Sequence, residues 1–429
     1  MHATCSFSIK EITKVEGHAN LNIELRNGRV EKCELAIFEG QRFFEQMLVG
    51  KHFSQVPLIV SRICGFCNTS HLNTSIEAIE KAFSVKPSGQ TLMLRELATN
   101  AEFIKSHVLH LVFLVLPDFL EKESAFDFTG EETRYIQWAM ELKKVASDLL
   151  KALGGRVYPT ISIRPGGFTA LPKQSELSAM LPALRKAKET ASQIIDLVDS
   201  FKQQFSFERK TEHVALVGSK YCLLCGQVRC SDGTIVPEGQ YAKHIKEFVV
   251  PYSTAKQAHF NGKEYMVGSL ARMNLNQKEL CDSAIGKIAE LGLRFPSNKI
   301  YGNNIAQAIE LLQCVESSIE IIELLQLRKE QIPAIVPKEA EGVGITEAPR
   351  GTLYHHYAFD SKGLVTQANI IVPTLQNNRN IELDLHSFIP TLLDLSQEKA
   401  ELEIEKLIRA YDPCISCATH FLKVKWRKN

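Results

Sequence analysis

The chain has 429 residues, of which 45% are hydrophobic and 23% are charged, and its formal net charge is +1. This balance is ordinary for a soluble globular protein and lacks the basic footprint of nucleic-acid binding, so we expect no nucleic-acid partner. Single hydrophobic cores rarely grow beyond about 250–300 residues. We therefore expect residues 1–429 to form one large catalytic unit with insertions, or else two poorly separated lobes.

The sequence predicts a cytoplasmic protein without a membrane span. Its most apolar run, residues 111–116, stops at Pro117 and is far shorter than the roughly 18–20 residues that a spanning helix needs. The first residues contain no basic region followed by an apolar run, so they do not predict a secretory signal.

The first elements in chain order are strands. Loosely alternating apolar residues over 9–24 and 30–38, on either side of Asn27-Gly28, predict a β-hairpin. Helices are then predicted from apolar spacing and breakers over residues 70–83, 90–116, 131–153, 176–207, 277–291, 304–327 and 395–411. Short β-like runs broken by Gly and Pro predict a β-rich insertion over 214–273, and a second hairpin is expected over 351–374. The predicted fold class is α+β and mainly α, a bundle of long helices with small peripheral sheets.

Eleven cysteines in a chain without a signal peptide argue against a disulfide framework and for thiols with chemical roles. Two Cys-x-x-Cys pairs, each followed by a histidine, lie near opposite ends of the chain: Cys64, Cys67 and His71, and Cys414, Cys417 and His420. Four soft thiolates select zinc, iron–sulfur clusters or soft transition metals. A structural zinc remains an alternative, although such a site usually ties together a short local segment.

The residues around both pairs resemble the signatures of nickel–iron hydrogenase large subunits. The matching motifs run along essentially the whole chain: Val15-Glu16-Gly17-His18, Arg42-Phe43-Phe44-Glu45, Arg62-Ile63-Cys64-Gly65-Phe66-Cys67, Ala348-Pro349-Arg350-Gly351, residues 368–374, and Asp412-Pro413-Cys414-Ile415-Ser416-Cys417. The resemblance implies the large-subunit fold of that family. It also implies an oxidoreductase that cleaves H₂ reversibly into protons and electrons.

In that family four thiolates bind nickel, and two of them also bridge to an iron that carries CO and cyanide ligands. By resemblance, Cys64 and Cys414 are terminal nickel ligands, whereas Cys67 and Cys417 bridge nickel and iron. A terminal thiolate, here Cys414, accepts the proton when H₂ is split heterolytically.

Five further residues are expected around the metals by the same resemblance. Arg350, beside Pro349, lies over the open site, where its fixed N–H donors suit cyanide nitrogens and bound H₂. Thr374 donates a hydrogen bond to a cyanide, and His71 hydrogen-bonds a bridging sulfur. Glu16 relays the proton from the terminal thiolate. The plainer alternatives are a surface arginine, a strand threonine, a core histidine and a solvated glutamate.

A second metal site is expected from Glu45 and His420, which match the family's carboxylate and C-terminal histidine, together with the main-chain carbonyl of Ile370. The ion is Mg²⁺ or Fe²⁺. One carboxylate plus waters suits magnesium, whereas a histidine ligand is less usual for it. The identity of the metal therefore stays open.

One departure from the family pattern indicates the electron partners. Many membrane-bound relatives carry an aspartate where this chain has Ser106, a feature more like the soluble branch that couples H₂ to NAD(P) or a deazaflavin. No glycine-rich dinucleotide fingerprint follows a strand here, so NAD(P) is expected on another subunit. We expect an iron–sulfur small subunit, and then flavin- and NAD(P)-carrying diaphorase subunits, to take the electrons.

Maturation in the family predicts two further kinds of partner: nickel-insertion proteins, and a protease that removes the residues after the terminal histidine. Here that tail is residues 421–429, with four basic side chains. Burying unpaired charge is costly, so this tail cannot follow His420 and Cys417 into the interior. We expect cleavage between His420 and Phe421.

Three other functions stay open on the sequence: an H₂-sensing regulatory hydrogenase, a non-catalytic relative similar to the quinone-site subunit of respiratory complex I, and a zinc-stapled structural subunit. The complex I branch has lost the cysteine pairs that this chain keeps. A separate trio, Cys222, Cys225 and Cys230, has metal-like spacing but no fourth ligand nearby, so unliganded thiols are expected there.

Overall fold

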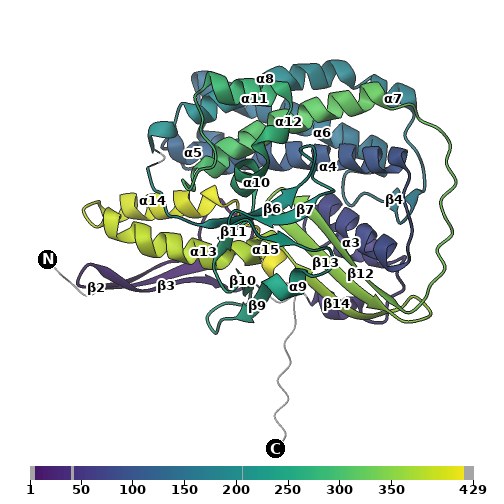
Figure 1. Cartoon of the computed structure of the whole chain (residues 1–429). Coiled ribbons are helices and arrows are strands. Elements are labelled where there is room, and N and C mark those ends of the chain that lie inside the picture. The colour runs from purple at the N-terminus through teal and green to yellow at the C-terminus, as the bar shows by residue number, and fades with distance from the viewer. Residues whose placement is uncertain (1–4, 40–42, 205, 420–429) are drawn as a thin grey trace, which may run out of the picture.

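The computed structural model describes residues 5–39, 43–204 and 206–419 (Figure 1). Its helices are α1 (Phe44–Leu48), α2 (Val56–Val60), α3 (Asn68–Ala82), α4 (Gly89–Leu109), α5 (Leu116–Phe119), α6 (Thr133–Gly154), α7 (Gln174–Ser178), α8 (Leu181–Asp199), α9 (Tyr241–His244), α10 (Ser269–Asn276), α11 (Asp282–Glu290), α12 (Gly302–Leu324), α13 (Pro373–Phe388), α14 (Gln397–Ala410) and α15 (Ile415–Ala418). Its strands are β1 (Cys5–Ile9), β2 (Ala19–Arg26), β3 (Arg29–Ile37), β4 (Ile163–Arg164), β5 (Gly167–Phe168), β6 (Glu212–Val217), β7 (Gln227–Cys230), β8 (Ile235–Val236), β9 (Ile245–Val249), β10 (Lys256–Phe260), β11 (Tyr265–Met266), β12 (Ala340–Ala348), β13 (Gly351–Phe359) and β14 (Val365–Ile371).

The long helices α4, α6, α8 and α12 pack together in one layer, drawn blue to green at the top of Figure 1. Helix α6 buries one face, with Leu142, Ala146, Leu149 and Leu153 at helical spacing. Helix α12 is buried on nearly every side along its first fourteen residues, which makes it the centre of the layer. Polar side chains on α12 must therefore find partners inside the protein.

The strands form small separate sheets beside this layer. The largest antiparallel meander has the order β12-β13-β14, and α3 packs directly across β12. This contact requires glycine in the strand, because a Cβ atom at Gly344 would lie 1.9 Å from the carbonyl oxygen of Thr74 on α3. The other sheets have the orders β1-β2-β3, β11-β6-β7-β8, β9-β10 and β4-β5.

The predicted α+β class, mainly α, is confirmed, but several boundaries differ. The first predicted strand is wrong in extent: β1 ends at Ile9 and β2 begins at Ala19, because left-handed residues at Glu11 and Lys14 turn the chain between them. The predicted helix over 90–116 is α4, which runs on through a π-helical turn at His110–Val115. The predicted helix over 176–207 is split into α7 and α8.

Two of the longer elements, β12 and α13, were not predicted from the sequence. Strand β12 carries two glycines among its nine residues, which weakens its strand signal. Helix α13 buries a row of amide side chains, Gln376, Asn377, Asn378 and Asn380, so its buried face lacks hydrophobic periodicity. None of the helices in the described ranges is long and apolar enough to cross a membrane.

Candidate metal centre

The four cysteines of the two Cys-x-x-Cys pairs converge on one buried point. Cys67 directly precedes α3, and Cys414 directly precedes α15, which contains Cys417. The Sγ atom of Cys414 lies 2.8 Å from that of Cys417 and 3.4 Å from that of Cys64. The Sγ atoms of Cys67 and Cys417 are 3.8 Å apart, and no member of the set is more than 5% exposed. Four thiols in this arrangement fit a soft metal centre.

Burial and mutual hydrogen bonding separate the acidities of these thiols. Hydrogen bonds, first of all from Cys414, lower the pKa of Cys64 well below its ordinary value. Burial raises the pKa of Cys414 and of Cys417 well above theirs. A second buried thiolate beside the first is unfavourable, so a bound cation is needed for all four thiols to lose their protons.

Glu16 contacts the C-terminal pair through its backbone and its side chain. The N–H of Ile415 donates to the Glu16 carbonyl oxygen at 2.9 Å, which fixes the turn that carries Cys414. The Sγ atom of Cys414 donates to Oε2 of Glu16 at 3.2 Å, and the N–H of Ser416 donates to the same oxygen at 3.0 Å. Because the Glu16 side chain is half-buried, it connects the buried thiol with the outer layer of the protein.

Arg350 lies beside the thiols at the turn between β12 and β13. Its Nε donates to the Asp412 carbonyl oxygen at 2.8 Å, and its Nη2 lies 2.9 Å from Oδ1 of the same residue. Its guanidinium lies 5.4 Å from the centroid of the Phe66 ring, a cation–π contact. The buried Nη1 has no hydrogen-bond partner within the described ranges. A buried donor without a protein partner indicates that a ligand or water belongs there.

Thr374 and His71 approach the same region from α13 and α3. The Thr374 hydroxyl oxygen accepts a hydrogen bond from the N–H of Cys414 at 2.9 Å, which leaves its own proton to be donated elsewhere. Nδ1 of His71 lies 3.0 Å from Nε2 of His355, and the other ring nitrogen of His355 contacts the Tyr357 hydroxyl. His71 therefore begins a buried polar chain that the sequence did not indicate.

The sequence profile of the family described as nickel-dependent hydrogenase matches residues 42–170 and 227–420. The chain belongs to this family. Sulfhydrogenase 1 subunit alpha of Pyrococcus furiosus is 33% identical, over 97% of this chain and 98% of that protein. NAD-reducing hydrogenase HoxS subunit beta of Cupriavidus necator is 29% identical, over 96% of this chain and 94% of that protein. The crystal structure of an NAD⁺-reducing [NiFe]-hydrogenase in its H₂-reduced state matches with a TM-score of 0.86 and 26% identity, over 97% of this chain and 100% of that chain.

The family confirms the resemblance seen in the sequence, and the protein is an oxidoreductase that uses H₂. Membership of the nickel-dependent hydrogenases implies a nickel–iron centre. The site fits such a centre on its own chemistry, because three of its thiol sulfurs lie within 4.8 Å of one another and the fourth is in contact with two of them. The unpartnered Nη1 of Arg350 supplies a donor for a ligand beside the sulfurs.

The second predicted metal site of this hydrogenase is only partly described. Oε1 of Glu45 accepts a hydrogen bond from the N–H of Ile370 at 2.9 Å, so these two predicted residues do lie together. Nζ of Lys256 lies 3.8 Å from Oε2 of Glu45 and 3.1 Å from Oε1 of Glu247. His420, the third predicted member, lies outside the described residues.

Asp412 is a site residue whose role the sequence did not reveal. Its carboxylate pairs with Arg350, and its Oδ2 accepts a hydrogen bond from Nε2 of Gln307 at 3.0 Å. In the sequence, the position of Asp412 directly before Pro413 and Cys414 was the feature that pointed to the site. A partner on α12, more than one hundred residues away in the sequence, was not visible.

The third group of cysteines is corrected by the structure of this hydrogenase. Unliganded thiols were expected at Cys222, Cys225 and Cys230, but the first two form a disulfide. Their separation of three residues lets a tight turn bring the two sulfurs together, whereas Cys230 stays a free, buried thiol on β7. The expectation therefore holds for Cys230 and is wrong for the other two.

Proposed function

We propose that this hydrogenase subunit cleaves H₂ reversibly and heterolytically, with the Cys414 thiol holding the proton and Glu16 carrying it away. The observation that supports this most directly is the 3.2 Å hydrogen bond from Cys414 Sγ to Glu16 Oε2. When bound, a nickel–iron pair with CO and cyanide on the iron supplies the redox chemistry. Cys64, Cys67, Cys414 and Cys417 would supply the thiolates that hold it, with those of Cys67 and Cys417 shared by the two metals.

Arg350 and Thr374 orient the ligands around that pair. The guanidinium stays charged, because Asp412 and the neighbouring thiolates outweigh the effect of burial and keep the pKa of Arg350 well above its ordinary value. Its free Nη1 donates to a cyanide nitrogen or toward H₂. With the cofactor bound, the Thr374 hydroxyl would donate to a cyanide, Pro349 would line the same site, and His71 would hydrogen-bond a shared cysteine sulfur.

Electrons leave through an iron–sulfur small subunit and pass on to NAD(P) by way of flavin-carrying diaphorase subunits. Two similar proteins support this part of the proposal, since one is a subunit of an NAD-reducing hydrogenase and another is part of an NAD⁺-reducing enzyme. The proposed compartment is the cytoplasm.

Glu45, His420 and the Ile370 carbonyl hold Mg²⁺ or Fe²⁺ in the mature subunit. Nickel-insertion proteins load the centre, and a protease then cuts between His420 and Phe421. Intact-mass analysis of the active enzyme tests the cut: a mass that ends at His420 supports it, whereas full activity with Asn429 still attached overturns it.

Metal analysis combined with H₂–D⁺ exchange tests the proposed reaction. The native complex is purified without oxygen, its nickel, iron and zinc are quantified, and exchange is measured on the same sample. Nickel and iron together with exchange support the proposal. Zinc alone, or full nickel without exchange, overturns it.

A further inference from the structure

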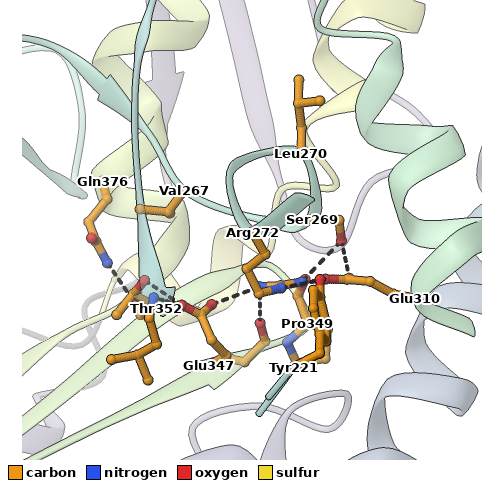
Figure 2. Close-up of polar contacts among 12 residues, drawn as sticks. Tyr221, Val267, Ser269, Leu270, Arg272, Glu310, Glu347, Pro349, Thr352 and Gln376 are labelled. Atoms are coloured by element: carbon orange, nitrogen blue, oxygen red, sulfur yellow. Dashed lines mark hydrogen bonds and ion pairs between the residues drawn. The ribbon is translucent and has the colours of Figure 1, made fainter. Parts of the chain in front are cut away.

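Arg272 lies between the carboxylates of Glu310 and Glu347, as Figure 2 shows. Its Nε donates to Oε1 of Glu310 at 2.6 Å and its Nη2 to Oε2 at 2.8 Å, whereas its Nη1 donates to Oε2 of Glu347 at 2.7 Å. The three side chains come from α10, α12 and β12, and none is more than 2% exposed. One guanidinium therefore joins three elements that are far apart in the sequence.

Further groups form hydrogen bonds with the carboxylates of Glu310 and Glu347. These are the hydroxyls of Ser269, Tyr221 and Thr352, the N–H of Leu216, and Nε2 of His107. Although burial opposes it, Arg272 with its hydrogen bonds holds the pKa of Glu310 below its ordinary value, so this carboxylate stays charged. Removing one partner of such a buried pair leaves an uncompensated charge, so breaking any one of these contacts is strongly unfavourable.

The same guanidinium reaches the two peptide carbonyls that directly precede Arg350. Nη1 donates to the Ala348 oxygen at 3.1 Å, and Nη2 donates to the Pro349 oxygen at 3.0 Å. After Arg350 the chain turns at Gly351, whose φ of +135° favours glycine and where a Cβ atom would lie 2.4 Å from the Val267 side chain. The backbone is thus fixed on both sides of Arg350.

Helix α12 supplies both anchors of the arginine at the metal centre. Asp412 pairs with the tip of the Arg350 side chain and is itself held by Gln307. Glu310 holds Arg272, which in turn holds the two peptide carbonyls directly before Arg350. Gln307 and Glu310 are three residues apart and so lie on one face of the helix.

We propose that Arg272 is a positioning residue that sets where the Arg350 guanidinium lies relative to the thiols. Arg272 acts through the peptide of residues 348–350, and its effect on turnover rests on the proposed function. Lysine cannot replace it, because a single ammonium nitrogen cannot present a planar fork to two carboxylates and two carbonyls at once.

The first test is Arg272→Lys in the intact complex. Nickel content is expected to stay at the parent level, while H₂–D⁺ exchange falls about 100-fold, the size expected for a displacement of about 1 Å at a reacting centre. Arg95→Lys is the matched control, since Arg95 is equally buried, makes two bonds to Glu80 and one to the Arg164 carbonyl. Its exchange rate should stay within about twofold of the parent. Equal losses of exchange in Arg272→Lys and Arg95→Lys would show that Arg272 has only a structural role and would overturn the proposal.

A double-mutant cycle tests whether Arg272 acts through Arg350. In an Arg350→Lys background, Arg272→Lys should lower the remaining exchange by only about twofold, because the group that it positions is already gone. A full further loss on top of Arg350→Lys would overturn the proposal. If Arg272→Lys does not fold, Glu347→Gln removes one of the two anchoring charges and is expected to lower exchange about tenfold; parent-level exchange in that variant would overturn the proposal as well.

A crystal structure of the Arg272→Lys protein separates this inference from the proposed reaction. If the parent complex contains full nickel but shows no H₂–D⁺ exchange, the proposed reaction is wrong. The position of Arg350 in the variant crystal structure would then be the only test of the inference. An Arg350 guanidinium displaced from its 2.9 Å pair with Asp412 and its place 5.4 Å from the Phe66 ring supports it. A guanidinium that keeps both contacts overturns it.

Discussion

The thiol of Cys414 and the carboxylate of Glu16 form a hydrogen bond of 3.2 Å, and the backbones of the same two residues form a parallel β-bridge. A segment near the N-terminus is thereby joined to the turn that carries Cys414 and Cys417. The backbone contact sets the distance between the two side chains, and in the proposed reaction the proton would move along the side-chain contact.

Glu16→Gln should lower H₂–D⁺ exchange by about 100-fold or more while leaving nickel content unchanged, because an amide keeps the shape but cannot cycle a proton. Glu39→Gln is the matched control. Glu39 also contacts the C-terminal turn, because its carboxylate accepts a hydrogen bond from the Ser416 hydroxyl, and it accepts another from the N–H of His18. Its variant should exchange normally. Parent-level exchange in Glu16→Gln would mean that protons leave by another route.

Cys414→Ser should abolish exchange and leave the fold largely intact. A hydroxyl is a poor ligand for a soft metal, and the added cost of a buried hydroxyl is about 1–3 kcal/mol. Circular dichroism, nickel content and exchange are measured together. Cys314→Ser, at an equally buried cysteine on α12, should lose similar stability but keep exchange. Near-normal exchange with full nickel in Cys414→Ser would remove Cys414 from its role.

Phe66→Val should speed inhibition by CO. Phe66 lies between Cys64 and Cys67 in the sequence, and its ring lies against the Arg350 guanidinium, so a smaller side chain opens space beside the centre. The rate of CO inhibition is followed in stopped-flow assays. Phe83→Val, in the buried aromatic cluster with Phe53 and Phe359, controls for general loosening of the core. If the two variants and the parent are inhibited at the same rate, the ring serves packing alone.

His213 should make stability depend on pH below neutrality. Burial lowers the pKa of this histidine from 6.5 to about 4, so between these values the unfolded chain binds the proton and the folded chain does not. Above about pH 6.5 this histidine is neutral in both states and does not lower the free energy of unfolding. As the pH falls toward 4 the free energy of unfolding decreases, by about 2 kcal/mol between pH 7 and pH 5. Urea unfolding at both pH values checks this, and the loss should be smaller by that amount in His213→Gln. An identical loss in parent and variant would assign the pH dependence to other groups.

The sequence by itself determined the chemistry of the centre. The Cys64/Cys67 and Cys414/Cys417 pairs place thiols three residues apart, a spacing that suits one metal. The family motifs around them indicate the nickel–iron centre, whereas the same spacing at Cys222 and Cys225 forms a disulfide. Motifs such as Ala348-Pro349-Arg350-Gly351 carry the family signal in their order along the chain. A helix with clear apolar periodicity, such as α6, was also predictable, because one buried face needs only local spacing.

Only the tertiary structure decided which residues support that centre. Glu310, Arg272 and Glu347 lie on three different elements, and in the sequence each is an ordinary charged residue with a solvated face as its simplest interpretation. Their burial depends on α12 passing through the middle of the bundle and on β12 approaching α10, contacts between residues far apart in the sequence. Side-chain spacing along the chain reports which face of an element is apolar, but the partner of a buried charge is fixed by long-range packing, and no local pattern encodes it.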